Sequence, residues 1–300
     1  MNPSLPHFDA ARSCLVRSTI ECAFARHTVS LDGTEIEKQL EEIAWLGSRG
    51  DSMFSSAAEP ENQARFRSAW AVLMRLDGVA RSLSACAEFP GIKRVLERSR
   101  SLALPSMPDG DYRTQGELEA WDVFFEIECA ARLRGLGEVS FDEPDIRIVD
   151  DGAILSVACK RPRRKNAIAK AVHRGTKQIV RQKSLGLIAV GLDVDVSAAV
   201  SGPDGSSTWD QSQSALRGLV EEVASDVKLA MRSVATDAPH GPVYTVFMLR
   251  TVAIQPGPPG YTAIIPRFHY KAVAAEASPF SEPLEDLLVE RMIASEPRFP

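Results

Sequence analysis

The feature that most constrains this chain is a hairpin signal near its middle. Two stretches that alternate apolar and polar residues, 144–149 and 153–160, are separated by Asp150, Asp151 and Gly152. An Asp-Gly pair between alternating stretches is typical of a two-residue β-turn, and such a turn fixes which residues face each other across the hairpin. The sequence therefore predicts two antiparallel strands with a defined register.

That register predicts the contents of each hairpin face, because alternate residues of a strand point the same way. With Asp151 and Gly152 as the loop, the polar face pairs Asp145 with Ala158 and Glu143 with Lys160, and directly paired Cβ atoms lie roughly 5 Å apart. A carboxylate and a lysine so close together can hold a divalent metal and a phosphate. The opposite face is apolar and is expected to pack on a core, through Pro144, Ile146, Ile148, Leu155, Val157 and Cys159.

Composition narrows the class of protein. Hydrophobic residues make up 44% and charged residues 25% of 300 residues, which is ordinary for a globular protein of about two domains. No apolar run approaches the roughly 20 residues of a membrane helix, and the first residues lack a signal-peptide pattern. Five scattered cysteines indicate reduced core residues, and we expect a cytoplasmic protein without a membrane partner. Neither a Walker A loop, a dinucleotide-binding glycine triad nor a GxSxG elbow is present.

One segment carries most of the positive charge. Ten Lys or Arg and no acid lie between Lys160 and Lys183, whereas the rest of the chain has 25 basic and 40 acidic residues. Within it, the helical spacing of 166–182 predicts a cationic stripe opposite an apolar one. Phosphate contact is the favoured interpretation, and docking on an acidic region of the same chain or of a partner is the alternative. The residues expected to bind nucleic acid are Arg161, Arg163, Arg164, Lys165, Lys170, Arg174, Lys177 and Arg181.

The chain divides into a helical first part and a mixed second part. Residues 1–105 show helical periodicity, 106–115 are rich in Pro, Gly and Asp and form the expected linker, and 116–300 alternate helices with strands. We therefore predict an α/β (α+β) fold, a mixed sheet flanked by helices, preceded by an all-helical N-terminal domain.

Four features in order resemble the PD-(D/E)xK, or restriction-endonuclease-like, nuclease superfamily. They are Glu126 on a helix, Pro144-Asp145 on a strand, Cys159-Lys160 on the next strand, and Gln178 on the following helix. The resemblance covers about residues 116–192. It implies a restriction-endonuclease-like sheet and hydrolysis of phosphodiester bonds with Mg²⁺ or Mn²⁺.

The same resemblance implies a role for each residue. Asp145, Glu126 and the backbone carbonyl of Cys159 would hold the metal, which polarises the phosphate and lowers the pKa of a bound water. Lys160 would be the catalytic lysine, and Gln178 an accessory polar group of the catalytic set. Such domains occur in restriction, phage defence, mobile elements and repair.

One motif position departs from the family pattern. The second strand carboxylate belongs two residues before the lysine, where this chain has Ala158, and a methyl group cannot bind a metal. Three explanations stay open: the carboxylate role has moved to Glu126, Glu128 or Glu143, an active enzyme has been inactivated by Glu→Ala, or the domain is a natural pseudonuclease.

The leading hypothesis is a metal-dependent nuclease acting on nucleic acid, with double-stranded DNA favoured over RNA. The alternatives are a catalytically inactive nucleic-acid-binding module and a protein-interaction scaffold. The N-terminal helices offer no chemistry of their own, and an oligomer or a protein partner contacting them is the expectation for that region.

Overall fold

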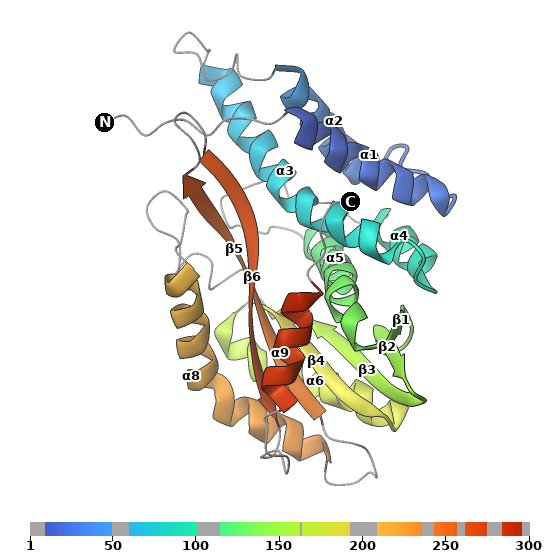
Figure 1. The fold of residues 1–300 in the computed structure, drawn as a ribbon, viewed down its shortest axis with the longest axis vertical. Helices are drawn as coiled ribbons and strands as arrows, with labels where there is room; N and C mark the ends of the chain where they lie inside the picture. Colours follow the sequence, from blue (N-terminus) through green and yellow to red (C-terminus); the bar gives the residue numbers. More distant parts are fainter. Residues whose placement is uncertain are drawn as a thin grey trace.

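The computed structural model describes residues 10–49, 60–100, 115–162, 164–192, 209–235, 243–256, 262–274 and 284–295. Helices dominate the first hundred residues, and helices and strands alternate afterwards (Figure 1). The helices are α1 Ala10–Arg26, α2 Glu35–Arg49, α3 Pro60–Cys86, α4 Ile92–Arg100, α5 Gln115–Leu133, α6 Ile168–Gln182, α8 Trp209–Ala235 and α9 Leu284–Ala294, with short 3₁₀ turns η2 Arg134–Leu136 and η3 Lys165–Ala167.

A six-stranded mixed sheet forms the centre of the second part. Its strands follow sequence order, β1 to β6, with β3, β4 and β5 parallel and the remaining neighbours antiparallel. The α/β prediction is confirmed at this level. The strands are β1 Glu138–Ser140, β2 Ile146–Asp150, β3 Ala153–Lys160, β4 Leu185–Gly191, β5 Val243–Pro256 and β6 Thr262–Ala274.

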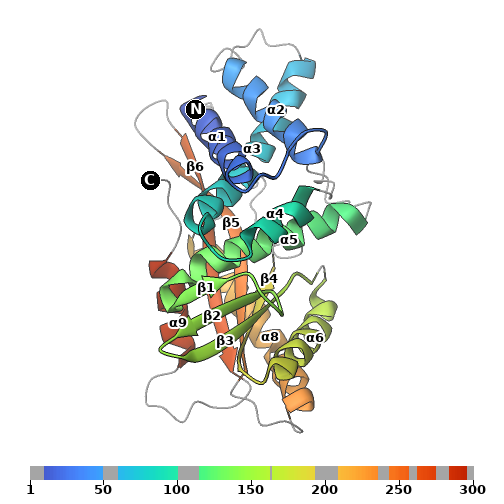
Figure 2. The same ribbon diagram turned by 90° about the vertical axis from the view of Figure 1, so that its right-hand side faces the viewer.

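Both faces of the sheet are covered by helices (Figure 2). Alternate strand residues enter two separate cores: Val157, Leu187 and Val246 join the core that contains α5 and Met292 of α9. Ala158, Ile188 and Phe247 join the core built with α6 and α8. Burial on both faces explains why β4 is an almost unbroken apolar run.

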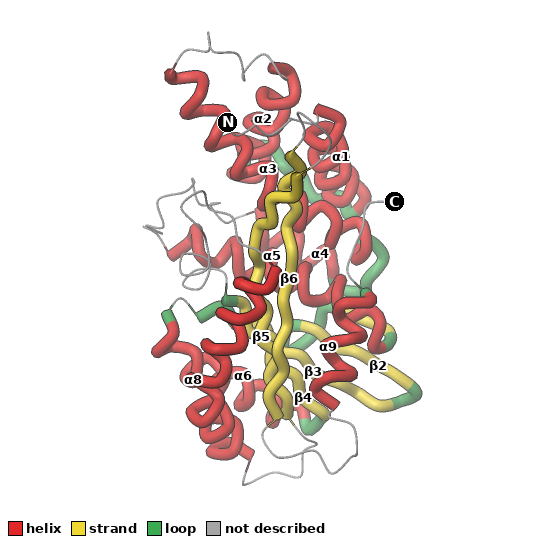
Figure 3. Tube along the Cα trace, turned by 60° about the vertical axis from the view of Figure 1, so that its left-hand side comes forward, coloured by secondary structure: helices red, strands yellow, loops and turns green. Residues whose placement is uncertain are grey.

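The helices α1 to α4 share the first core with α5 and the sheet. Helix α3 packs against α5, and the long β5–β6 ribbon extends past the other strands toward these helices (Figure 3). The expected linker at 106–115 lies almost wholly outside the described residues, so the division at that point stays a prediction. Among the described residues, no helix is long and apolar enough to cross a membrane.

The hairpin register is confirmed near the turn. Val149 pairs with Ile154 and Arg147 with Ser156, and Asp151 and Gly152 both adopt positive φ, 45° and 81°, as a type I′ turn requires.

The predicted register is wrong at the open end of the hairpin. Strand β2 begins only at Ile146, opposite Val157, so neither Asp145 with Ala158 nor Glu143 with Lys160 forms a ladder pair. The physical reason is that the Cys159 N–H donates its hydrogen bond to the Asp145 carboxylate, so a side chain accepts it in place of a backbone carbonyl of the neighbouring strand. Two residues of the expected polar face, Ser156 and Ala158, are buried, and Ala158 belongs to the core built with α6 and α8.

Candidate active site

Asp145 lies where β2 and β3 separate. Its Oδ2 accepts a hydrogen bond from the Cys159 backbone N–H at 2.7 Å and lies 3.3 Å from Lys160 Nζ. Both described contacts of Asp145 use Oδ2, and its side chain is 16% exposed. The backbone of β3 therefore fixes one carboxylate oxygen, and the partial exposure leaves the carboxylate within reach of a ligand.

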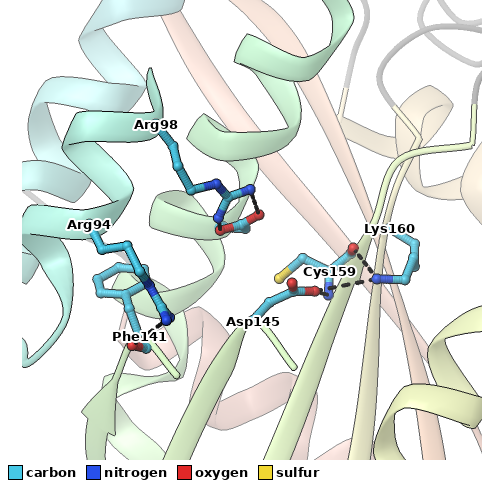
Figure 4. A network of polar contacts seen from close by, with 7 residues as sticks. Arg94, Arg98, Phe141, Asp145, Cys159 and Lys160 are labelled. Atoms are coloured by element: carbon cyan, nitrogen blue, oxygen red, sulfur yellow. Dashed lines mark hydrogen bonds and ion pairs between the residues drawn. The ribbon is translucent and has the colours of Figure 1, made fainter. Parts of the chain in front are cut away.

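Lys160 is the last residue of β3 and lies at the same point. Its ammonium donates to the Cys159 carbonyl at 2.8 Å as well as pairing with Asp145 (Figure 4). The predicted carboxylate–lysine juxtaposition is therefore present, although Asp145 rather than Glu143 is the partner. Glu143 is exposed.

Glu126 approaches the same site from α5. Burial raises the pKa of Glu126 to about 7; the hydrogen bonds from Arg98 lower it, and the nearby Asp145 charge raises it. The Arg98 guanidinium donates a hydrogen bond to each oxygen of the Glu126 carboxylate, at 2.9 and 3.1 Å. The charges of Asp145 and Lys160 act on the Glu126 carboxyl, and the hydrogen bonds described for Glu126 are both with Arg98.

Position 158 has no room for a side chain larger than alanine. Ala158 is fully buried, and a Cβ built on Gly175 of α6 would lie 3.5 Å from its methyl group. The same Cβ would lie 3.1 Å from Ile188, so the α6 backbone lies directly over this part of the sheet. A longer side chain at position 158 would point at the α6 backbone, and the alanine serves helix–sheet packing.

The remaining candidates differ in placement. Gln178 lies on α6 with a buried Oε1 that accepts no hydrogen bond from the described residues, and no described contact joins it to Asp145, Glu126 or Lys160. Glu128 is buried on α5, and its backbone carbonyl accepts a hydrogen bond from Arg132. Among the three acids considered as substitutes for the missing carboxylate, Glu126 has a pKa that the charge of Asp145 raises.

The cationic stripe of α6 is confirmed as an exposed surface. Ile168, Val172, Gly175 and Ile179 are buried, and the opposite stripe is exposed. The exposed cations of α6 are Lys170, Arg174, Lys177 and Arg181.

The loop before α6 is placed differently from the stripe. Arg161 is 8% exposed and pairs with Asp122 at 3.4 Å, and Lys165 pairs with Glu222 of α8. Arg164 is exposed, and Arg163 lies outside the described residues. Two cations expected to contact nucleic acid are therefore paired with acids of the same chain.

The oxygen donors of this site fit a hard divalent cation. Mg²⁺ binds through one or two carboxylates together with waters and substrate phosphates. Asp145 and Glu126 supply two carboxylates, and the Cys159 carbonyl a further oxygen. The Cys159 side chain packs against the first core, and burial raises the pKa of its thiol. No group of three or more His, Cys, Asp or Glu is assembled around a metal position in the described ranges, so substrate oxygens would have to complete the coordination.

Sequence reasoning missed two arginines of α4. Arg98 holds Glu126, and Arg94 donates to the backbone carbonyl of Phe141 at 3.1 Å. Their four-residue spacing on an amphipathic helix was the one available signal, and it could not name partners 28 and 47 residues away.

Comparison with protein-family models, curated proteins and solved structures finds no match for this chain.

We expect Glu126 to make stability pH-dependent. Its pKa is about 7 in the folded protein against an ordinary 4.5, so the unfolded chain binds fewer protons between these values. Stability contributed by the protonated carboxyl is then complete below pH 4.5 and is lost as pH rises toward 7. We expect the free energy of unfolding in urea of wild type to fall by about 1–3 kcal/mol relative to that of Glu126→Gln as pH rises through this window.

The matched control for that experiment is Glu138→Gln, which changes an exposed glutamate on β1. It should track wild type at every pH. If the stabilities of Glu126→Gln and wild type change in parallel from pH 4.5 to 7, the raised pKa of Glu126 is contradicted.

Proposed function

We propose that this chain is a metal-dependent nuclease of the restriction-endonuclease-like type, hydrolysing phosphodiester bonds of DNA. The observation that carries the proposal is the contact of Asp145 with Lys160, 3.3 Å apart at the point where two strands separate. Glu126 on the preceding helix interacts with both. The order of elements supports the same reading: α5 with the acid, β2 after the aspartate, β3 ending in the lysine, then α6.

The chemistry proposed is attack of a water oxygen on phosphorus, breakage of one P–O bond, and transfer of a proton to the leaving alkoxide. A divalent cation, when bound, would neutralise phosphate charge and lower the pKa of a water. Lys160 contributes a fixed positive charge toward the phosphate oxygens, where negative charge develops. Asp145 and Glu126 would supply carboxylate oxygens to the cation, and the hydrogen bond from the Cys159 N–H keeps Asp145 in place.

The exposed cations of α6 support a polyanionic substrate. Lys170, Arg174, Lys177 and Arg181 form one row, and no ion pair joins them to an acid in the described part of the chain. A row of unpaired cations along a helix binds phosphates by displacing condensed counterions.

A second candidate is a nucleic-acid-binding module without catalysis. The packing of Ala158 against α6 favours it, because a third carboxylate has no room at the position where the family pattern has one. Both candidates share the cationic row and differ only in turnover.

Cleavage of supercoiled plasmid in Mg²⁺ or Mn²⁺, and its loss in EDTA, is the expected result for wild type. Asp145→Asn should lower the rate by roughly 100-fold or more, since the amide oxygen can still accept the Cys159 N–H while the charge is gone. Lys160→Ala should do the same, and the matched control Lys228→Ala, an exposed lysine of α8, should cleave normally.

Cleavage that persists in both site variants would reject the assigned site. DNA binding by wild type without any cleavage in either metal would favour the binding module, and absence of binding at low salt would favour a scaffold.

Binding through the α6 row should depend steeply on salt. Removing two phosphate contacts with Lys177→Gln and Arg181→Gln should make the slope of log K against log salt shallower by roughly 2 for duplex DNA. Fluorescence anisotropy with a labelled duplex across a KCl series measures this slope. The control removes two exposed cations of α8, Arg217→Gln and Lys228→Gln, and an equal effect of that pair would contradict a specific α6 surface.

A further inference from the structure

We infer that α4 holds two segments of the site in place and that its Arg98 is a positioning residue for Glu126. This inference assigns a role to the N-terminal helices, for which the sequence indicated no chemistry. It rests on the proposed function for its catalytic consequence, whereas its structural content concerns two arginines and the segments that they hold.

The first contact joins α4 to the acid on α5. Arg98 donates through both terminal nitrogens to the two oxygens of Glu126, a bidentate geometry that fixes the carboxylate's orientation as well as its position. The Glu126 side chain is 7% exposed and the Arg98 side chain 49% exposed. Arg98 therefore reaches from the surface into the site.

The second contact joins α4 to the segment that leads to Asp145. Arg94, one turn before Arg98, donates to the Phe141 carbonyl at 3.1 Å, as Figure 4 shows. The Phe141 N–H donates to the Pro90 carbonyl at 2.8 Å. Gly91, at φ +83°, lets the backbones meet, because a Cβ there would lie 2.2 Å from the Phe141 oxygen.

Two acids of the site are thus held from one short helix. Residues four apart lie on the same side of a helix, so Arg94 and Arg98 act in the same direction. One holds Glu126 directly, and the other holds the chain four residues before Asp145. A shift of α4 would move both acids, and catalytic groups tolerate errors of about 1 Å poorly.

Removal of the Arg98 side chain leaves the Glu126 carboxyl without the two hydrogen bonds that fix its orientation. The Glu126 side chain is 7% exposed, so water has little access to replace these bonds. A buried polar group that loses its partner is costly, and we expect the Glu126 side chain to move when Arg98 is removed.

The first test is a double-mutant cycle in the full chain, with the free energy of unfolding in urea measured for wild type, Arg98→Ala, Glu126→Gln and the double variant. Because Arg98 and Glu126 share two hydrogen bonds, the double variant should lose clearly less stability than the sum of the two single variants. The matched control cycle replaces Arg98→Ala by Arg100→Ala, an exposed position of α4, and its two changes should add.

Plasmid cleavage supplies the second readout. Arg98→Ala should lower kcat at pH 7 by roughly 10- to 100-fold with little change in KM, Arg98→Lys should recover part of the loss, and Arg100→Ala should cleave like wild type. Additive losses of stability in the cycle of Arg98 with Glu126 would overturn the inference. A wild type that never cleaves would defeat the proposed function, and the cycle would still decide whether Arg98 holds Glu126.

Discussion

The site depends on the contacts of the Asp145 carboxylate with the Cys159 N–H and the Lys160 ammonium. Directly before β2 begins, it accepts the hydrogen bond from the Cys159 N–H that a neighbouring strand would otherwise accept, and it pairs with Lys160 through the same oxygen. A buried N–H left without a partner costs roughly 1–3 kcal/mol, so this contact also stabilises the end of β3. The position where two strands separate is thereby turned into a charged site.

Burial on both faces of the sheet sets what the site can contain. On one face α5 brings Glu126 toward Asp145, and on the other α6 closes over Ala158. The protein therefore has a carboxylate on the Glu126 side whose pKa responds to Asp145, and a buried alanine at position 158 on the other side. Mg²⁺ requires few protein ligands when phosphate oxygens complete its shell, so two carboxylates are compatible with metal-dependent hydrolysis.

Local patterns predicted local structure well. The Asp151-Gly152 turn set the register of the hairpin, and the two stripes of α6 are buried and exposed as their spacing indicated. The start of β2 was missed because strand periodicity carries no information on where a side chain replaces a backbone partner. Arg98 with Glu126 and Lys165 with Glu222 were missed because each pair joins helices far apart in sequence.

Manganese broadening of side-chain carboxyl ¹³C signals tests most directly whether Asp145 and Glu126 form one metal-binding site. With a phosphorothioate duplex present, small additions of Mn²⁺ should broaden the signals of Asp145 and Glu126 first. The exposed neighbours Asp142 and Glu143 serve as internal references and should broaden only at much higher Mn²⁺. Equal broadening of all four carboxyl groups, or sharp Asp145 and Glu126 signals under conditions in which the protein cleaves DNA, would contradict a shared metal site.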